Sequence, residues 1–266
     1  MGLNTLRDLN SVRLSDFTSN KKFSDERRYL ANAPIRCAIL SGTKNREIFY
    51  DVFYRLNSGS VPLSGQELRQ VFYKGDFAQY LFEATSEAGP LHALLGITGP
   101  DPRLFDIELI LRYLAINLDL APYRGDLRAY LDTTMQELSE SWPARSEKIR
   151  GMRKELDDVI EATGEHFGAV FMGRKYTGAK LSRRFNKAVF EVQAYYFSRL
   201  SRERLIGVPA EQFKDAFKNL CRDPSFRSSI EATTKSHERF QARFNLFSRL
   251  RKKQCRWCRS GGLFSL

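Results

Sequence analysis

The chain has few of the residues from which disulfide and metal sites are built. Its 266 residues include four cysteines and three histidines. Four cysteines are too few for a disulfide scaffold at this length, so we expect a reduced, cytoplasmic protein. The histidines are isolated, with neither a paired-histidine nor a Ser/His/Asp spacing. They are His92, His166 and His237.

Long apolar runs and glycine-rich phosphate loops are also missing. No run of about 18 apolar residues occurs, and residues 1–20 lack the apolar core of a signal peptide. We therefore expect no membrane partner. Neither a Walker A loop nor G-x-G-x-x-G is present, which excludes two common nucleotide-binding loops. With 42% hydrophobic and 28% charged residues, the chain can bury a sizeable core in one or two domains.

Acidic residues are scarce in the C-terminal third. Residues 174–266 hold 22 Lys and Arg against 7 Asp and Glu, a net charge of +15, whereas residues 1–173 hold 21 against 24, a net charge of −3. Such an asymmetry indicates a polyanionic partner, of which nucleic acid is the commonest. The alternative is a basic solvated surface without a specific partner.

Two clusters of cations carry this charge. One lies in the segment 174–184, and the other follows a predicted helix over 233–253. Apolar rings line the opposite face of that helix, and at this spacing Phe240, Phe244 and Phe247 are typical of a core rather than of base-stacking platforms. The cations could contact a phosphate backbone or form a solvated helix face. The residues predicted to bind DNA are Arg174, Lys175, Lys180, Arg183, Arg184, Lys235, Arg239, Arg243, Arg249, Arg251, Lys252 and Lys253.

The hydrophobic spacing along the chain is mostly helical. We expect a mainly α protein, with a small α/β remnant at the N-terminus followed by a multi-helix bundle. Residues 103–118 should be central to the core. The predicted domains are residues 1–75, residues 76–253 and a tail over 254–266. The predicted helices span 3–9, 23–32, 46–56, 64–73, 76–85, 103–118, 126–141, 144–164, 181–200, 211–221 and 233–253, with a polar loop after residue 9, a short turn at 92–95, a Trp-Pro pair closing the helix 126–141, and one strand over 35–40.

The segment 52–69 has the most specific local pattern. A helix runs into Arg-x-Asn-Ser-Gly, and Ser64 with Glu67 three residues later predicts a capping box at the next helix. Polar groups in front of a helix N-terminus suit a phosphate. The alternative is an ordinary junction with a glycine C-cap. The residues predicted to bind a nucleotide or phosphate are Arg55, Asn57, Ser58, Gly59, Glu67 and Arg69.

A Cys-x-x-Cys pair near the C-terminus is a candidate zinc ligand set. Cys255 and Cys258 could supply two thiolates, but tetrahedral zinc needs two more ligands and no Cys or His follows. A redox function is not favoured, because redox Cys-x-x-Cys motifs open a helix after a strand.

The segment 53–69 also resembles a known family. Its pattern Phe-x-Arg-Leu-Asn-x-Gly-x-x-Pro-Leu-x-x-x-Glu-Leu-Arg is similar to the second signature of the GmrSD-type restriction endonuclease N-terminal domain family. Asn4-Thr5-Leu6-Arg7 resembles the tail of its first signature. That family has a ParB/sulfiredoxin-like, nucleotide-dependent core followed by a helical region. The resemblance covers most of the chain, with similar elements at 23–25, 35–40, 108–115 and 185–191.

The resemblance implies a nucleotide-dependent DNA endonuclease that uses a nucleoside triphosphate with Mg²⁺. It places Arg55 and Asn57 on phosphate or on the neighbouring signature, and Gly59 where the backbone approaches closely. Glu67 and Arg69 could pair internally or orient the turn. The family's Asp-Gly-Gln-Gln-Arg signature is absent from the start of this chain, so we expect the nucleotide chemistry to be incomplete, and no catalytic residue is assigned. Cys255-Arg-Trp-Cys258 resembles the opening half of an HNH nuclease zinc knuckle.

Together these patterns predict a chain truncated at both ends. We expect a DNA-binding component related to modification-dependent restriction nucleases in phage defence, acting as a homo-oligomer or with a partner protein. The alternatives are a non-enzymatic helical interaction or regulatory module, and an inactive remnant.

Overall fold

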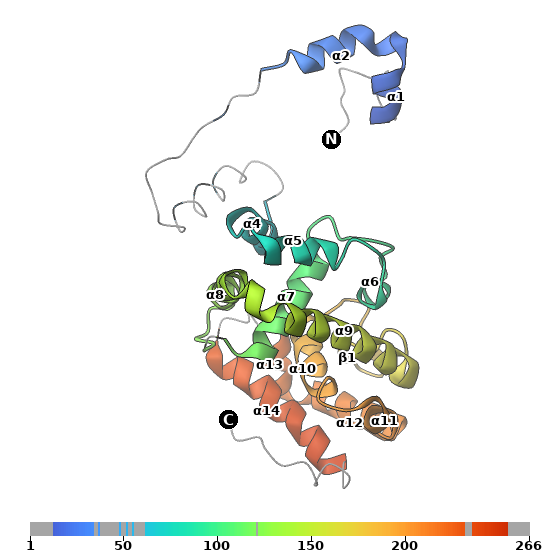
Figure 1. Cartoon of the computed structure of the whole chain (residues 1–266). Helices are drawn as coiled ribbons and strands as arrows, with labels where there is room; N and C mark the ends of the chain where they lie inside the picture. Colours follow the sequence, from blue (N-terminus) through green and yellow to red (C-terminus); the bar gives the residue numbers. More distant parts are fainter. Residues whose placement is uncertain are drawn as a thin grey trace. The chain divides into compact units, whose positions relative to one another are not determined.

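The computed structural model of the chain describes residues 13–34, 37, 48, 52, 55, 62–120, 122–231 and 236–254 (Figure 1). The chain divides into two compact units, residues 1–52 and 53–266, and each is described by itself. The described part holds many helices and one two-stranded antiparallel sheet, which confirms a mainly α protein. Several predictions lie outside the described residues: the helix over 3–9, the strand over 35–40 except Cys37, most of the helix over 46–56, Asn57, Ser58, Gly59, Lys235, Cys255 and Cys258.

The first unit contains α1 (Leu14–Ser19), the 3₁₀ helix η2 (Lys21–Phe23) and α2 (Ser24–Ala31). The Asn20 side chain caps η2 by accepting a hydrogen bond from the Lys22 backbone N–H at 2.9 Å. Phe17 stacks on Phe23 with the ring centroids 5.9 Å apart. This contact gives α1 an apolar anchor where the sequence predicted a polar loop. The predicted helix over 23–32 is confirmed by α2.

The second unit is a helical bundle around one apolar core. Its central helix is α7, which packs against α4, α5, α8, α9 and α10 and buries Leu109, Ile110 and Leu114 completely, as predicted (Figure 1). The elements of this unit are α4 (Gly65–Phe72), α5 (Asp76–Glu83), α6 (Pro90–Leu95), α7 (Phe105–Leu118), α8 (Leu127–Glu140), α9 (Trp142–Phe167), β1 (Tyr176–Thr177), β2 (Lys180–Leu181), α10 (Lys187–Phe197), α11 (Arg202–Ile206), α12 (Ala210–Arg222), α13 (Pro224–Glu231) and α14 (His237–Gln254).

Side-chain caps fix where these helices begin. Ser64 and Glu67 form the predicted capping box at α4. Asp126 accepts hydrogen bonds from two backbone N–H groups at the start of α8. Pro143 stands in the first turn of α9, where its missing N–H costs no helical bond, so the Trp-Pro pair opens α9 instead of closing α8. Trp142 anchors the start of α9 by packing against Tyr80, with the ring centroids 5.0 Å apart.

A small hairpin stands where the predicted helix over 181–200 was expected to start. Strands β1 and β2 pair antiparallel, and Gly178 takes a φ of +65° in the turn between them. The helix begins only at Lys187, because Asn186 has an extended backbone and its side chain caps the helix by accepting from Val189 N. The remaining part of the prediction is confirmed by α10, with Val189 buried.

Within the described part of the chain, no helix is both long enough and apolar enough to cross a bilayer.

Candidate anion-binding site

Two residues of the predicted phosphate site have structural roles. Arg69 is 3% exposed, and its Nε donates to Asp132 Oδ1 at 2.7 Å, so it joins α4 to α8 instead of facing a ligand. The Glu67 carboxylate accepts from the Ser64 backbone N–H and lies 3.3 Å from Arg103 Nε. For these two residues the structure shows the alternative of internal pairing, which leaves fewer groups free for an external phosphate. Arg55 is exposed.

The basic helix α14 is less exposed than its charge suggests. Arg243 is 1% exposed, its Nη2 donates to Glu191 Oε2 at 2.6 Å, and its guanidinium lies over the Phe240 ring. It therefore does not belong to an exposed row, and Arg239, four residues earlier, is half-buried. Phe244 and Phe247 are buried, which confirms the prediction that the phenylalanine face of this helix packs in the core. Of the remaining predicted cations on this helix, Arg249 is exposed, and the side chains of Arg251, Lys252 and Lys253 lie outside the described set.

The other five predicted cations lie together in the segment 174–184, which contains the hairpin and no acidic residue. Lys180, Arg183 and Arg184 are exposed, whereas Arg174 and Lys175 are half-buried. Lys175 forms an ion pair with Glu231, and a guanidinium nitrogen of Arg174 donates to the Arg183 carbonyl. This segment therefore presents positive charge that neighbouring carboxylates neutralise only in part.

Gly173 fixes the segment against α10. Its N–H donates to Gln193 Oε1 and its carbonyl accepts from Asn186 N–H, both at 2.7 Å. Its φ is +72°, and a Cβ at this position would lie 2.2 Å from the Phe185 ring. Only glycine meets both conditions without displacing the ring.

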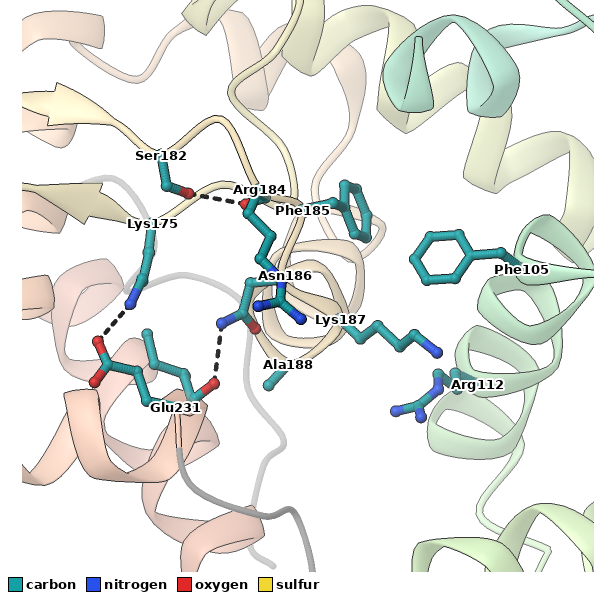
Figure 2. A pocket seen from close by; sticks show the side chains of 11 residues that line it. Phe105, Arg112, Lys175, Ser182, Arg184, Phe185, Asn186, Lys187, Ala188 and Glu231 are labelled. Atoms are coloured by element: carbon teal, nitrogen blue, oxygen red, sulfur yellow. Dashed lines mark hydrogen bonds and ion pairs between the residues drawn. The ribbon is translucent and has the colours of Figure 1, made fainter. Parts of the chain in front are cut away.

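A cavity of about 530 Å³ lies beside this segment. Figure 2 shows its wall, to which α7, α10, α13 and the chain before α10 contribute. Phe105 and Phe185 form part of the wall and meet edge to face, with ring centroids 5.8 Å apart. The charged side chains on the wall are Arg112, Lys175, Arg184, Lys187 and Glu231.

Two of the wall cations belong to a largely buried ion network. Arg112 Nη1 lies 2.5 Å from Glu191 Oε1, and its Nη2 lies 2.6 Å from Glu108 Oε1. Lys187 Nζ lies 2.6 Å from Glu108 Oε2. Because Glu191 also pairs with Arg243, three cations share two carboxylates. The network thus carries one positive charge that no carboxylate within it neutralises.

Burial and the neighbouring charges shift the pKa values of Glu108, Lys187 and Arg112. Burial disfavours the charged form of Glu108, but Arg112 and Lys187 outweigh it and hold the pKa of this carboxyl at about 2. Burial lowers the pKa of Lys187, and Glu108 opposes that shift. Burial likewise opposes the charge of Arg112, yet Glu191 and Glu108 raise its pKa. The Glu108 carboxyl is therefore ionised at neutral pH.

The N-terminus of α10 reaches the same cavity. Lys187 and Ala188 line it, and the positive end of the helix dipole adds to the charge of the side chains. Asn186 holds this end in place, because its Nδ2 donates to Ile230 O at 2.9 Å while its Oδ1 caps the helix. The cavity wall therefore carries more positive than negative charge.

The sequence analysis did not assign Arg112, Lys187, Glu108 or Glu191 to a site. Glu108 and Arg112 are four residues apart, as are Lys187 and Glu191, so an i, i+4 charge pattern inside two apolar helices was the available signal. Among the described residues, no group of three or more His, Cys, Asp or Glu side chains is placed to hold a metal.

No protein-family model, no curated protein and no solved structure matches the chain.

Proposed function

We propose that the chain is a DNA-binding component related to modification-dependent restriction nucleases in phage defence. Its contribution is to hold the phosphate backbone of DNA through the basic segment 174–184. The resemblance of residues 53–69 to the GmrSD-type family supports the restriction context. The nucleoside triphosphate with Mg²⁺ that this resemblance implies stays a prediction for the present chain, as does zinc at Cys255 and Cys258.

The observation that carries the proposal is the arrangement of segment 174–184. It collects five cations without an acidic residue, exposes three of them, and borders a cavity with further cations on its wall. Lys and Arg that neutralise phosphates release counterions from DNA, which supplies affinity without reading sequence. Hydrogen bonds of Gly173 with Gln193 and Asn186 hold this segment against α10, so its cations are carried on a fixed backbone.

A salt titration tests the proposal. We would measure binding of a labelled duplex of about 30 base pairs to the chain between about 50 and 200 mM salt, where backbone contacts dominate affinity. We expect log affinity to fall linearly with log salt. The double variant Lys180→Gln/Arg183→Gln, which removes two exposed cations that do not line the cavity, should make the slope shallower by about 2, since each phosphate contact contributes about 0.9.

Lys148→Gln/Lys154→Gln is the matched control, because both lysines are exposed on α9 outside the basic third. Its slope should equal that of the unmodified chain. The proposal is overturned if the unmodified chain binds no duplex at the lowest salt, or if both double variants change the slope equally.

A further inference from the structure

We propose that the cavity beside α10 binds a phosphate monoester, supplied either by the end of a nucleic-acid strand or by a free nucleotide. Supply of the phosphate by the end of a nucleic-acid strand rests on the proposed function, whereas the cavity and its charge do not depend on it.

Charge favours a monoester over the diester of an internal backbone phosphate. Of the four wall cations, Lys175 pairs with Glu231, and Arg112 and Lys187 belong to the network that keeps one positive charge. No carboxylate among the described residues pairs with Arg184. A phosphate monoester carries about −1.5 to −2 charge at pH 7 and offers three strong acceptor oxygens. A diester carries a single charge and has two free oxygens, so it leaves more of the wall charge unneutralised.

Size and shape also select a terminal group. A volume of about 530 Å³ lies within the range of small-molecule pockets, so a nucleotide-sized group can enter. A cavity of this volume cannot admit a whole duplex. Phe105 and Phe185 give the wall apolar faces against which the attached sugar or base can pack.

The buried network prepares the cavity for an anion before any ligand arrives. Glu108 and Glu191 hold the Arg112 guanidinium from two sides, and Glu108 also holds Lys187. Cations fixed in this way lose little side-chain freedom on binding. The unneutralised positive charge of the network lies in a site of low exposure, where an incoming anion is attracted more strongly than at an open surface.

The test compares single-stranded oligonucleotides of one sequence that end in a phosphate or in a hydroxyl, using the full chain. Both 5′ and 3′ phosphates would be tried, with thymidine monophosphate and inorganic phosphate as competitors. A charge-assisted hydrogen bond corresponds to about a tenfold to hundredfold change in affinity. We expect the phosphorylated end to bind tighter than the hydroxyl end by that factor, and thymidine monophosphate to compete for it.

Two neighbouring arginines provide the variant and its control. Arg184→Gln removes a cation from the wall, whereas Arg183→Gln removes an exposed cation that does not line the cavity. Both side chains are exposed, so both variants should fold. The ratio of phosphate-end to hydroxyl-end affinity should approach one in Arg184→Gln and stay unchanged in Arg183→Gln. Overall affinity for the oligonucleotide should fall in both.

The outcomes separate this inference from the proposed function. Equal affinity for both ends, with no competition by thymidine monophosphate, overturns the inference, even where covalently closed circular DNA still binds in a salt-dependent way. Binding of thymidine monophosphate that Arg184→Gln weakens, without binding of closed circular DNA, supports the inference with a free nucleotide as the source and overturns the proposed function. The inference is also overturned if Arg184→Gln leaves the ratio of phosphate-end to hydroxyl-end affinity unchanged.

Discussion

Replacing Glu191 by glutamine should destabilise the helical bundle severely. The Glu191 side chain is 1% exposed and accepts from Arg112 at 2.5 Å and from Arg243 at 2.6 Å. Glutamine keeps the shape but removes the charge, so Arg243 is left buried with no carboxylate partner. Arg112 retains only Glu108. Two further nitrogens of Arg243, Nε and Nη1, are buried without a hydrogen-bond partner, so no other described group can take over.

The magnitude follows from this burial. Removing one partner of a buried ion pair costs about 3–5 kcal/mol, because an uncompensated charge stays behind in a medium of low dielectric constant. For a unit of roughly 200 residues, each kcal/mol lowers Tm by about 2–4 °C, so we expect a decrease of about 6–20 °C. Circular dichroism at a helical wavelength reports this transition directly, since the unit is mainly helical.

Urea denaturation would give the same free energy from the transition midpoint, with the slope m unchanged. Glu211→Gln is the matched control, because its side chain is 84% exposed and its ion pair with Lys214 lies at the surface. That change should stay within about 0.5 kcal/mol. Adding Arg243→Met to Glu191→Gln should recover part of the lost free energy of unfolding, since it removes the buried cation that has no carboxylate partner.

The reasoning is refuted if Glu191→Gln costs less than about 1 kcal/mol, which is the scale of a surface pair. It is also refuted if Arg243→Met deepens the loss instead of relieving it.

Two further changes test the surroundings of the cavity. Because the folded-state pKa of Glu108 is about 2 against an ordinary 4.5, its ionisation stabilises the fold above pH 4.5, and this contribution of about 3 kcal/mol should be lost as the pH falls from 4.5 to 2. The stability advantage over Glu108→Gln in urea denaturation should therefore shrink between pH 6 and pH 3, and a constant difference would contradict the assignment. Gly173→Ala adds a clash with Phe185 to the cost of a positive φ, so it should lose about 2–5 kcal/mol and disturb the cavity wall. Gly178→Ala has open space around it and should lose only about 1–2 kcal/mol, and equal losses in the two variants would refute the role of the close contact.

Local signals in the sequence predicted much of the helical fold. The capping box at Ser64 and the apolar run over 103–118 each appear as expected, because a cap and a helical face are decided by neighbours within one or two turns. The start of α13 was missed although Asp223 and Pro224 mark it: the Asp223 carboxylate accepts from two backbone N–H groups, and Pro224 fills the first helical position.

The hairpin before α10 could not be predicted in the same way. The apolar spacing continues through Leu181 and Phe185, so it favours a helix. The helix begins only after Asn186, which caps it, and a tertiary hydrogen bond from the Asn186 N–H to the Gly173 carbonyl holds this residue in place. Because Asn186 and Gln193 are 13 and 20 residues away from Gly173, their hydrogen bonds with it do not affect the local spacing of apolar residues.

In the candidate site, too, the sequence predicted some residues and missed others. Composition identified the charge of segment 174–184, and two of its cations, Lys175 and Arg184, do line the cavity. Arg112 and Lys187 were missed, because their helices read as apolar core. Arg243 was counted among exposed cations, since sequence spacing cannot show which face of α14 packs against Glu191.

Four of the described cations therefore fall into three classes by location, and each class has its own measurable consequence. Arg243 lies in the core, so changes at its partner alter stability. Lys180 and Arg183 are exposed away from the cavity, so their loss should alter the salt dependence of DNA binding without altering stability. Arg184 is exposed and also lines the cavity, so it alone of these four should change the preference between phosphate and hydroxyl ends. A basic surface that lacked a site would give the last two classes the same response.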